Sequence, residues 1–367
     1  MTNDSCKKCD HHYSDVYSSK YRTISNSEPV HSGESLDFNT MPSEDGLITL
    51  REIEDARKNL EESDLGVIKT PLLKHVTGMF PQLPQSVDLY LKLENTQTTG
   101  SFKIRGVANQ MKFLPDDVKK GEKKLITMSA GNYGKAFAYA LQKHKLSGLC
   151  LMPITAPQSR VELIKGYGIK VEQSPTSQIQ ASIDEYVKEK KYNFLHSFDD
   201  LDLIAGYGSA SLEILEEDVK PDVVLVCCGG GGLVSGVASG FKLSGLKDSR
   251  IYAVEPEGSP TMYESYKKGS PVTMRVKSIA GGLSPPYAGT KAFQHCKKYV
   301  KDVILVSDQE ILDTMQQFYK RGLVVEPSGC AAMAALLGGH VPDIEGKKIV
   351  VFVTGGNVTP SEMVSLL

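Results

Sequence analysis

The sequence lacks the marks of a membrane, exported or nucleic-acid-binding protein. Its apolar stretches, such as residues 223–228, are too short to cross a bilayer and suit buried parallel strands instead. Residues 1–40 contain no apolar segment like that of a signal peptide, so export is not expected. The formal net charge of -2 leaves no electrostatic footprint for nucleic acid. We therefore expect neither a membrane nor a nucleic acid as a partner.

The sequence also lacks a disulfide framework. Its cysteines number 7, which is odd, and Cys227 and Cys228 are adjacent in a segment typical of a buried strand. These two residues and Cys330 have apolar or small neighbours, so we expect them to be packing residues. A reducing, cytoplasmic compartment is the better prediction.

Residues 1–40 are rich in serine, asparagine, histidine, lysine and aspartate and show no periodicity, which indicates a disordered tail. Within it, Cys6, Cys9, His11 and His12 have a spacing that zinc can use. No second CxxC or spaced histidine pair completes a zinc domain. A solvated tail is therefore the preferred interpretation.

The remainder alternates between strand-like and helical patterns, and a chain of 367 residues is long enough for two lobes. Strand-like runs lie at residues 89–93, 125–128, 148–152, 223–227, 251–254, 303–306 and 349–354. Helical patterns include residues 48–63, 103–113, 134–143, 160–167 and 179–190. The alternation predicts an α/β fold with parallel sheets and right-handed crossovers.

Lys103 is the most informative residue, and it lies in the segment TTGSFKIRG at residues 98–106. A lysine in a glycine/serine turn that opens a helix can present its amine to a pocket. Burial disfavours the charged form, and this activates lysines that form Schiff bases. Taken alone, the alternative of a solvated lysine at a helix start has the larger prior.

Four consecutive glycines join a predicted strand to a predicted helix: Gly229, Gly230, Gly231 and Gly232. Without side chains, several backbone N–H groups can converge, and the N-terminus of the next helix favours an anion. A tight turn would need only one glycine, so a phosphate cradle is preferred. A dinucleotide site is less well supported, because the spacing is not GxGxxG.

Two further motifs follow predicted strands. The first contains Ser129, Ala130, Gly131, Asn132 and Tyr133, whose N–H groups suit a substrate carboxylate and whose asparagine suits a ring hydroxyl. A helix N-cap is the alternative. In the second, Thr354 ends an apolar strand, where its hydroxyl suits a ring nitrogen or is simply at a strand edge. An amine, a phosphate loop and polar groups for a ring and a carboxylate together predict pyridoxal phosphate.

Acidic residues near the other motifs have ordinary explanations. Glu255 and Glu257 follow a predicted strand and could hold Mg²⁺ through oxygen ligands, although solvated loop acids are the more frequent case. Glu326 precedes Pro327, which is typical of a helix start.

These motifs, in this order, resemble the fold type II pyridoxal-phosphate enzymes, specifically the serine/threonine ammonia-lyase (dehydratase) and serine racemase group. The resemblance extends over about residues 48–358 and includes NFLHSFDD at 193–200 and IAGYG at 204–208. It implies two parallel-sheet α/β domains, the smaller inserted in the larger. Residues 41–123 and 201–367 would form the large cofactor domain, and residues 124–200 the small one. It also implies a homodimer that binds a small amino-acid substrate.

The resemblance gives each motif residue a role. Lys103 would be the catalytic Schiff-base lysine, with Phe102 beside the cofactor. Asn132 would bond the ring 3-oxygen and Thr354 the pyridine nitrogen. The phosphate would be bound by Gly229, Gly230, Gly231 and Gly232. The substrate-binding loop would consist of Ser129, Ala130, Gly131, Asn132 and Tyr133.

The sequence departs from the racemase pattern at two places. Racemases of this group carry a second serine as acid/base where this chain has Ala130, and a methyl group cannot deliver a proton. At their divalent-cation site Glu255 matches and Ser259 offers a carbonyl, but Thr261 replaces a carboxylate. Activation by Mg²⁺ is thus in doubt, and a monovalent cation is the other candidate.

The expected reaction is β-elimination. A threonine hydroxyl at the pyridine nitrogen is too weak an acid to keep the ring protonated, so a carbanion that expels its β-substituent promptly is favoured. The chain is therefore predicted to be an L-serine/L-threonine ammonia-lyase that forms a 2-oxo acid and ammonia. The alternatives are a serine racemase, a lyase for another β-hydroxy amino acid such as 3-hydroxyaspartate, a β-replacement enzyme, and a non-catalytic pyridoxal-phosphate-binding protein.

Overall fold

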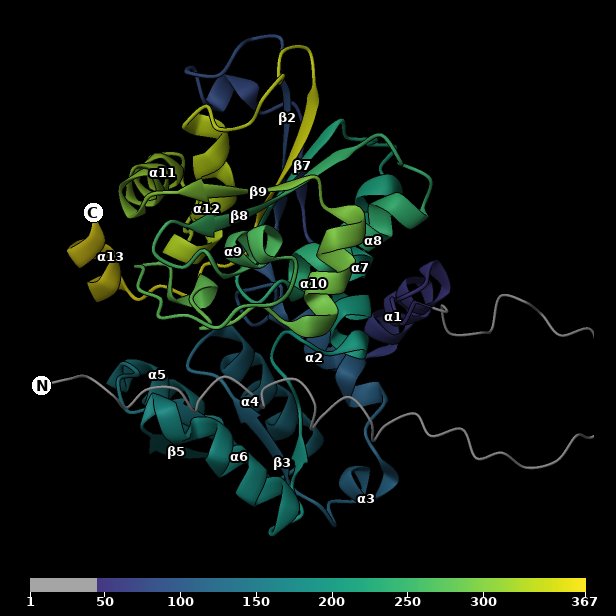
Figure 1. Ribbon diagram of the computed structural model, residues 1–367, viewed down its shortest axis with the longest axis vertical. Helices are drawn as coiled ribbons and strands as arrows, with labels where there is room; N and C mark the ends of the chain where they lie inside the picture. Colours follow the sequence, from purple (N-terminus) through teal and green to yellow (C-terminus); the bar gives the residue numbers. More distant parts are fainter. Residues whose placement is uncertain (1–44) are drawn as a thin grey trace, which may run out of the picture. The chain divides into compact units, whose positions relative to one another are not determined.

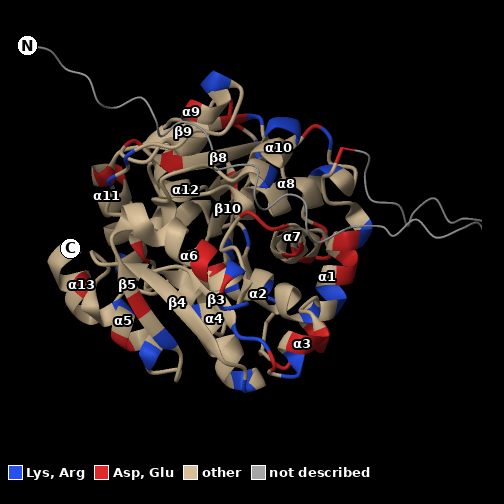
Figure 2. Ribbon diagram, turned by 60° about the horizontal axis from the view of Figure 1, so that its bottom comes forward, with Lys and Arg blue, Asp and Glu red and all other residues tan. Residues whose placement is uncertain are grey.

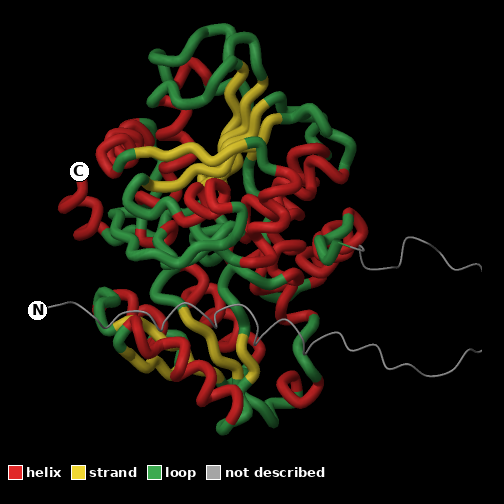
Figure 3. Tube along the Cα trace, in the orientation of Figure 1, coloured by secondary structure: helices red, strands yellow, loops and turns green. Residues whose placement is uncertain are grey.

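The computed structural model describes residues 45–367 (Figure 1). The predicted tail of residues 1–40, with Cys6, Cys9, His11 and His12, lies outside the described residues. The described residues belong to one compact unit, Pro42–Leu367. Its strands form two sheets, which Figure 3 shows as separate groups.

The larger sheet has six strands in the order β1-β2-β10-β7-β8-β9. The short β1 pairs antiparallel with β2, and the remaining neighbours are parallel. Its strands are β1 (Leu72–Leu73), β2 (Asp88–Leu93), β7 (Val223–Cys227), β8 (Arg250–Pro256), β9 (Asp302–Val306) and β10 (Lys348–Val353). The last strand in the sequence, β10, lies between β2 and β7, and helices connect the consecutive parallel strands β7, β8 and β9 as crossovers.

The smaller sheet has four parallel strands in the order β5-β4-β3-β6. They are β3 (Leu125–Met128), β4 (Gly148–Pro153), β5 (Lys170–Ser174) and β6 (Asn193–Phe194). All four lie between β2 and β7 in the sequence, so the smaller sheet is an insertion between strands of the larger one.

Thirteen α-helices lie within the described residues. Those before β7 are α1 (Leu50–Glu62), α2 (Lys103–Lys112), α3 (Asp116–Lys119), α4 (Asn132–His144), α5 (Gln158–Lys165), α6 (Ile179–Lys188) and α7 (Leu201–Leu215). Those after it are α8 (Gly232–Leu243), α9 (Thr261–Lys268), α10 (Thr290–Tyr299), α11 (Asp308–Lys320), α12 (Pro327–Leu337) and α13 (Pro360–Leu366). Short 3-10 turns include η2 (Thr77–Met79), η3 (Glu94–Thr96), η4 (Thr176–Gln178) and η5 (Gly281–Leu283).

The strands of the larger sheet are apolar on both faces because helices cover both. In β7, Val223 and Leu225 belong to the core cluster that contains α11 and α12. The intervening Val224 and Val226 belong to the cluster that contains α1, α2, α7, α8 and α10. Side chains alternate between faces along a strand, so a continuous apolar run is what a doubly covered parallel strand requires. The predicted α/β fold with parallel sheets is confirmed.

Charged residues of both signs are mixed on the outer helices, such as α1 and α3, whereas the strands of the larger sheet carry few (Figure 2). This agrees with the small net charge of the sequence. No helix in the described part of the chain is long and apolar enough to span a membrane.

Candidate active site

The turn before Lys103 pairs with the turn that follows β10. Ser101 and Gly355 form an isolated antiparallel bridge, and Phe102 N donates to Thr354 O at 3.2 Å. Gly356 N donates to Gly100 O at 2.9 Å. Gly100 has a φ of 74°, in the left-handed region that glycine adopts without strain. The structure thus brings two of the predicted motifs, at Lys103 and at Thr354, into direct contact.

The amine of Lys103 lies in a mostly apolar environment. Its Nζ donates to Ser197 O at 2.9 Å and lies 5.0 Å from the ring centroid of Phe102. The rings of Tyr133 and Tyr207 are each 5.7 Å away. No carboxylate among the described residues forms an ion pair with it. Burial therefore lowers the pKa of Lys103 to about 7, which gives a neutral, nucleophilic amine near neutral pH.

The turn after β6 presents the carbonyl group that Lys103 contacts. His196 Nδ1 accepts N–H groups from Phe198 at 3.2 Å and Asp199 at 2.9 Å. The proton of the neutral ring is therefore on Nε2, which lies 3.1 Å from the Tyr287 hydroxyl. Burial lowers the pKa of His196, in agreement with a neutral ring. The sequence pattern of residues 193–200 did not predict this role for His196.

The four glycines form a loop with no room for side chains. A Cβ at Gly230 would lie 2.1 Å from the ring of Phe198, and one at Gly232 would lie 2.4 Å from the carbonyl oxygen of the same residue. Gly231 has a φ of 95° and directly precedes α8. Within the described residues, the N–H groups of Gly229, Gly230 and Gly231 donate to no protein acceptor. Free N–H groups at a helix N-terminus fit a phosphate.

The loop from Ser129 to Tyr133 leads into α4, and the Ser129 side chain binds backbone N–H groups near the start of this helix. Its Oγ accepts the N–H groups of Gly131 at 3.3 Å and Gly134 at 3.0 Å. The N-cap residue itself is Gly131 rather than Ser129 or Asn132. The substrate-carboxylate role of the loop stays a prediction. Ala130 is half-buried and packs on the core with its methyl group. Tyr133 donates from its hydroxyl to Gln110 Oε1 at 2.7 Å.

The side chain of Asn132 is oriented by two partners, one directly before α12 and one in the loop after β10. Its Nδ2 donates to Glu326 Oε1 at 2.5 Å, and its Oδ1 accepts from Asn357 Nδ2 at 2.8 Å. Asn357 Nδ2 also donates to Thr99 O at 2.9 Å. An amide nitrogen carries two hydrogens, so Asn132 keeps one donor for a ring oxygen.

Glu326 is a site residue that the sequence analysis missed. It is the residue before α12, its side chain makes no cap hydrogen bond there, and its N–H donates to Gly355 O at 3.0 Å. Burial raises the pKa of Glu326 to about 7, although the Asn132 hydrogen bond and the charges of Arg160 and Lys135 oppose the rise. Glutamate is a poor N-cap residue, and this was the signal in the sequence that it has another role.

Thr354 is buried directly after β10, and Cys227, whose thiol accepts the N–H of Ala332 at 3.3 Å, ends the neighbouring strand β7. The strands β2, β10 and β7 are adjacent in the larger sheet. The predicted motifs follow β2, β3, β7 and β10, all at the carboxyl ends of parallel strands. Ligands of open α/β sheets bind at these ends. An amine, a free N–H cradle, an amide and a hydroxyl in this arrangement fit an aromatic aldehyde phosphate.

The candidate cation site does not fit a divalent metal. Glu255 Oε1 accepts the N–H of Met262 at 2.8 Å and the hydroxyl of Thr261 at 3.3 Å, and its Oε2 accepts the N–H of Tyr263 at 2.9 Å. The Ser259 hydroxyl donates to Leu283 O at 2.9 Å. No group of three His, Cys, Asp or Glu side chains suited to a metal occurs in the described residues. The N-terminus of α9 therefore satisfies the carboxylate that a cation would need.

Comparison with known proteins agrees with this geometry. The chain is 34% identical to a catabolic L-threonine dehydratase of Staphylococcus aureus over 321 residues, which cover 85% of this chain and 90% of that protein. A serine racemase structure from Dictyostelium discoideum is 31% identical, with a TM-score of 0.75 and coverage of 85% and 99%. A maize serine racemase structure is 30% identical, with a TM-score of 0.78 and coverage of 86% and 96%.

The family comparison covers most of the described residues. A family model described as pyridoxal-phosphate dependent enzyme matches residues 64–355, from the end of α1 to the turn after β10. This span contains Lys103, the glycine loop, Asn132 and Thr354. The chain belongs to the pyridoxal-phosphate dependent enzyme family.

Proposed function

We propose that this chain is an ammonia-lyase that uses pyridoxal phosphate to remove the β-hydroxyl group of L-serine or L-threonine, giving a 2-oxo acid and ammonia. The observation that carries the proposal is the Lys103 amine with its pKa of about 7, in a site whose glycine cradle has free N–H groups. The similarity to the catabolic L-threonine dehydratase supports the choice of substrate.

The residues divide the work as follows. The bound cofactor supplies an aldehyde for Lys103 and an electron sink for the bonds at the substrate α-carbon. The N–H groups of the glycine loop would hold its phosphate, the Asn132 amide would donate to its ring oxygen, and the Thr354 hydroxyl would donate to its ring nitrogen. The neutral amine of Lys103 removes the α-proton. The N–H groups of the Ser129 loop orient the substrate carboxylate.

Elimination rather than another reaction is favoured by Thr354. A hydroxyl group does not keep the ring nitrogen protonated, so the electron sink is weaker than one with a carboxylate partner. A substrate that loses its β-hydroxyl group promptly needs less delocalisation of the α-carbon electrons.

Serine racemase is the second candidate, because two solved racemases are 30% and 31% identical to this chain. Ala130 argues against it, since racemisation needs a proton donor on each face of the α-carbon and a methyl group supplies none. The reacting atoms do not distinguish serine or threonine from bulkier β-hydroxy amino acids or 3-hydroxyaspartate.

We also propose that residues 41–123 and 201–367 form the large cofactor domain and residues 124–200 the small domain. The separation of the two sheets supports this division. A cytoplasmic homodimer is the proposed state. The proposal contains no divalent cation, because both oxygens of Glu255 are engaged by α9; we expect any monovalent cation to be held by carbonyl oxygens.

The test is product analysis of purified, cofactor-loaded protein with a panel of L-β-hydroxy amino acids. Both the 2-oxo acid and the D-enantiomer are measured in the same samples. We expect rapid 2-oxo acid formation with little D-product, and no turnover from Lys103→Ala. D-product in excess would support the racemase, and turnover by Lys103→Ala would overturn the assignment of Lys103.

A further inference from the structure

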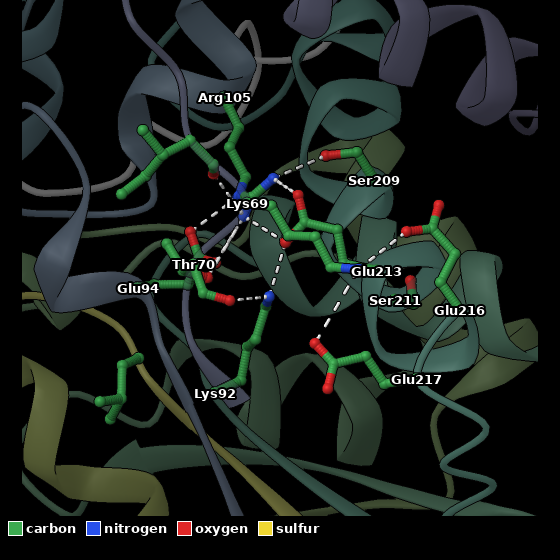
Figure 4. Close-up of polar contacts among 12 residues, drawn as sticks. Lys69, Thr70, Lys92, Glu94, Arg105, Ser209, Ser211, Glu213, Glu216 and Glu217 are labelled. Carbon is green, nitrogen blue, oxygen red and sulfur yellow. Dashed lines mark hydrogen bonds and ion pairs between the residues drawn. The ribbon is translucent and has the colours of Figure 1, made fainter. Parts of the chain in front are cut away.

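A closed network of four buried charged side chains is centred on Arg105, which follows Lys103 by two residues on α2. Lys92 comes from β2, Glu94 from η3, Arg105 from α2 and Glu213 from α7. Their side chains are between 0% and 2% exposed. Arg105 follows Lys103 by two residues, which is about 200° around a helix, so the two side chains leave α2 on opposite sides. Figure 4 shows Arg105 between the two glutamates, with Lys92 approaching Glu213.

Arg105 binds both carboxylates in a bidentate manner. Its Nε and Nη2 donate to Glu94 Oε2 and Oε1, each at 2.8 Å. Its Nη1 and Nη2 donate to Glu213 Oε1 at 2.7 Å and Oε2 at 2.8 Å. Lys92 Nζ completes the network by donating to Glu213 Oε2 at 2.6 Å and to Thr70 O at 2.7 Å. A planar guanidinium holds two carboxylates in a fixed geometry that an ammonium group cannot reproduce.

The network joins the two helices that shape the surroundings of the amine. No side chain caps the start of α2, so its first turn is not fixed in the usual way. Instead, α2 and α7 pack so closely that a Cβ on Gly106 would lie 2.6 Å from the Tyr207 ring. That ring contacts Phe102 with the centroids 4.8 Å apart and also lies near the Lys103 amine. A shift of α2 relative to α7 would therefore move the Lys103 amine relative to the aromatic rings beside it.

The charges within the network balance, with two cations against two carboxylates. Burial is the cause of the lowered pKa of Lys103, and no charge of the network contributes to it. The network can therefore hold α2 in place without charging the surroundings of the amine.

We propose that Arg105 is a positioning residue for Lys103: by clamping the first turn of α2 to η3 and α7, it fixes where the amine lies. This inference rests on the proposed role of Lys103 as the residue that reacts with the cofactor. The alternative is a network that only stabilises the fold. Buried ion pairs often contribute little net stability. A positioning role therefore predicts a large fall in kcat with a small change in melting temperature, whereas a purely structural role predicts a lowered melting temperature with unchanged kcat.

The test compares Arg105→Lys with Arg57→Lys. The first keeps the charge and removes the bidentate geometry. The second is the control, because Arg57 on α1 also pairs with a glutamate, the C-cap residue Glu216 of α7, but donates its hydrogen bonds to Glu61 and Glu216 rather than to the network. For each protein we would measure the melting temperature, kcat and KM, and the pH dependence of Lys103 labelling by an amine reagent in the cofactor-free protein, read by mass spectrometry.

For Arg105→Lys we expect kcat to fall about 100-fold with KM within about threefold, as is typical when a catalytic group is misplaced by about 1 Å. The labelling midpoint of Lys103 should move by about one pH unit. Arg57→Lys should match the wild type in its kinetic constants and in the labelling midpoint of Lys103. If Arg105→Lys does not fold, Glu94→Asp withdraws one carboxylate while keeping its charge and should lower kcat about tenfold.

A lowered melting temperature with unchanged kcat and labelling in the folded variants would overturn the positioning role. The proposed function fails by a different result. If the cofactor does not protect Lys103 from labelling in the wild-type protein, then Lys103 is not the reactive lysine, whatever Arg105 does.

Discussion

Ala130 occupies a position where a single hydroxyl group would change the chemistry. Its half-buried methyl group packs beside Ser129 at the start of α4 and offers no proton. We expect Ala130→Ser to form D-serine from L-serine at a rate at least about tenfold above the wild type, since a positioned acid/base typically contributes about 100-fold or more. Chiral chromatography of the products measures the change. An unchanged rate of D-serine formation in a folded, cofactor-loaded variant would contradict this prediction.

Glu326 is expected to make stability depend on pH. Its folded-state pKa is raised to about 7 by burial, from an ordinary value of 4.5. The folded protein then binds a proton that the unfolded chain has lost, so the wild type loses stability as pH rises from about 4.5 to 7. Glu326→Gln keeps an acceptor for Asn132 and removes the titration. The difference in melting temperature, variant minus wild type, should grow over this window and stay level above it.

Glu362 provides the matched control for this prediction. Its pKa is lowered, with burial opposed by hydrogen bonds from the Thr359 backbone and side chain and by Arg160. A lowered pKa contributes stability that is present above the unfolded value and lost on acidification. Glu362→Gln should therefore be less stable than the wild type at neutral pH. If the melting temperatures of both variants, each measured relative to the wild type, change with pH in the same direction, burial is not what sets the pKa of Glu326.

At the scale of elements, the loop between β7 and α8 depends on the absence of side chains. A Cβ at Gly230 would overlap the Phe198 ring, which is itself fixed by the His196 turn. We expect Gly230→Ala to cost about 1–3 kcal/mol in unfolding free energy and to weaken cofactor binding at least tenfold, because the ring or the loop has to move. Urea unfolding and a fluorescence titration with pyridoxal phosphate measure both.

Gly78→Ala is the control, since a Cβ there would meet nothing within 4 Å and its φ is not positive. It should bind the cofactor like the wild type. Equal cofactor affinities for the two variants would show that the glycine loop is not the phosphate site.

Helix α9 makes a prediction about metal removal. Its first N–H groups already engage both oxygens of Glu255, and burial raises the pKa of this carboxyl to about 8, so treatment with EDTA should leave the melting temperature and kcat of the wild type unchanged. Thr261→Asp adds a second buried carboxyl group beside Glu255, and its desolvation should destabilise the protein unless Mg²⁺ binds the pair. Thermal unfolding with and without Mg²⁺ tests both proteins. A wild type that loses stability in EDTA would contradict the prediction.

The elements that the sequence predicted well are those with continuous apolar runs. Strand β7 is buried throughout and β10 in all but its first residue, and their ends are within one residue of the predicted ones. Strand β5 was missed because its residues, KVEQS, are exposed or half-buried and mostly polar. The two-residue strands β1 and β6 are too short to leave a periodic pattern.

At the scale of the whole molecule, the motifs predicted from the sequence are the ones that carry their own local signal. Lys103 and the glycine loop each have an unusual local composition. The partnership of Asn132 with Glu326 could not be predicted, because it joins residues 194 positions apart and neither segment indicates the other. Lys92 is similar: a lysine in an apolar strand is usually solvated, and here its partner Glu213 is 121 positions away.

The same long-range contacts have a consequence for how the chain folds. Arg105 and Glu213 are 108 positions apart, and the four strands of the smaller sheet lie between them. Bringing together two residues so far apart in an unfolded chain costs conformational entropy before their contact can stabilise the fold. The smaller sheet has a core cluster of its own, so it can form first and bring the ends of α2 and α7 together. We therefore expect the contacts of Arg105 with Glu94 and Glu213 to form late in folding, after the smaller sheet has folded.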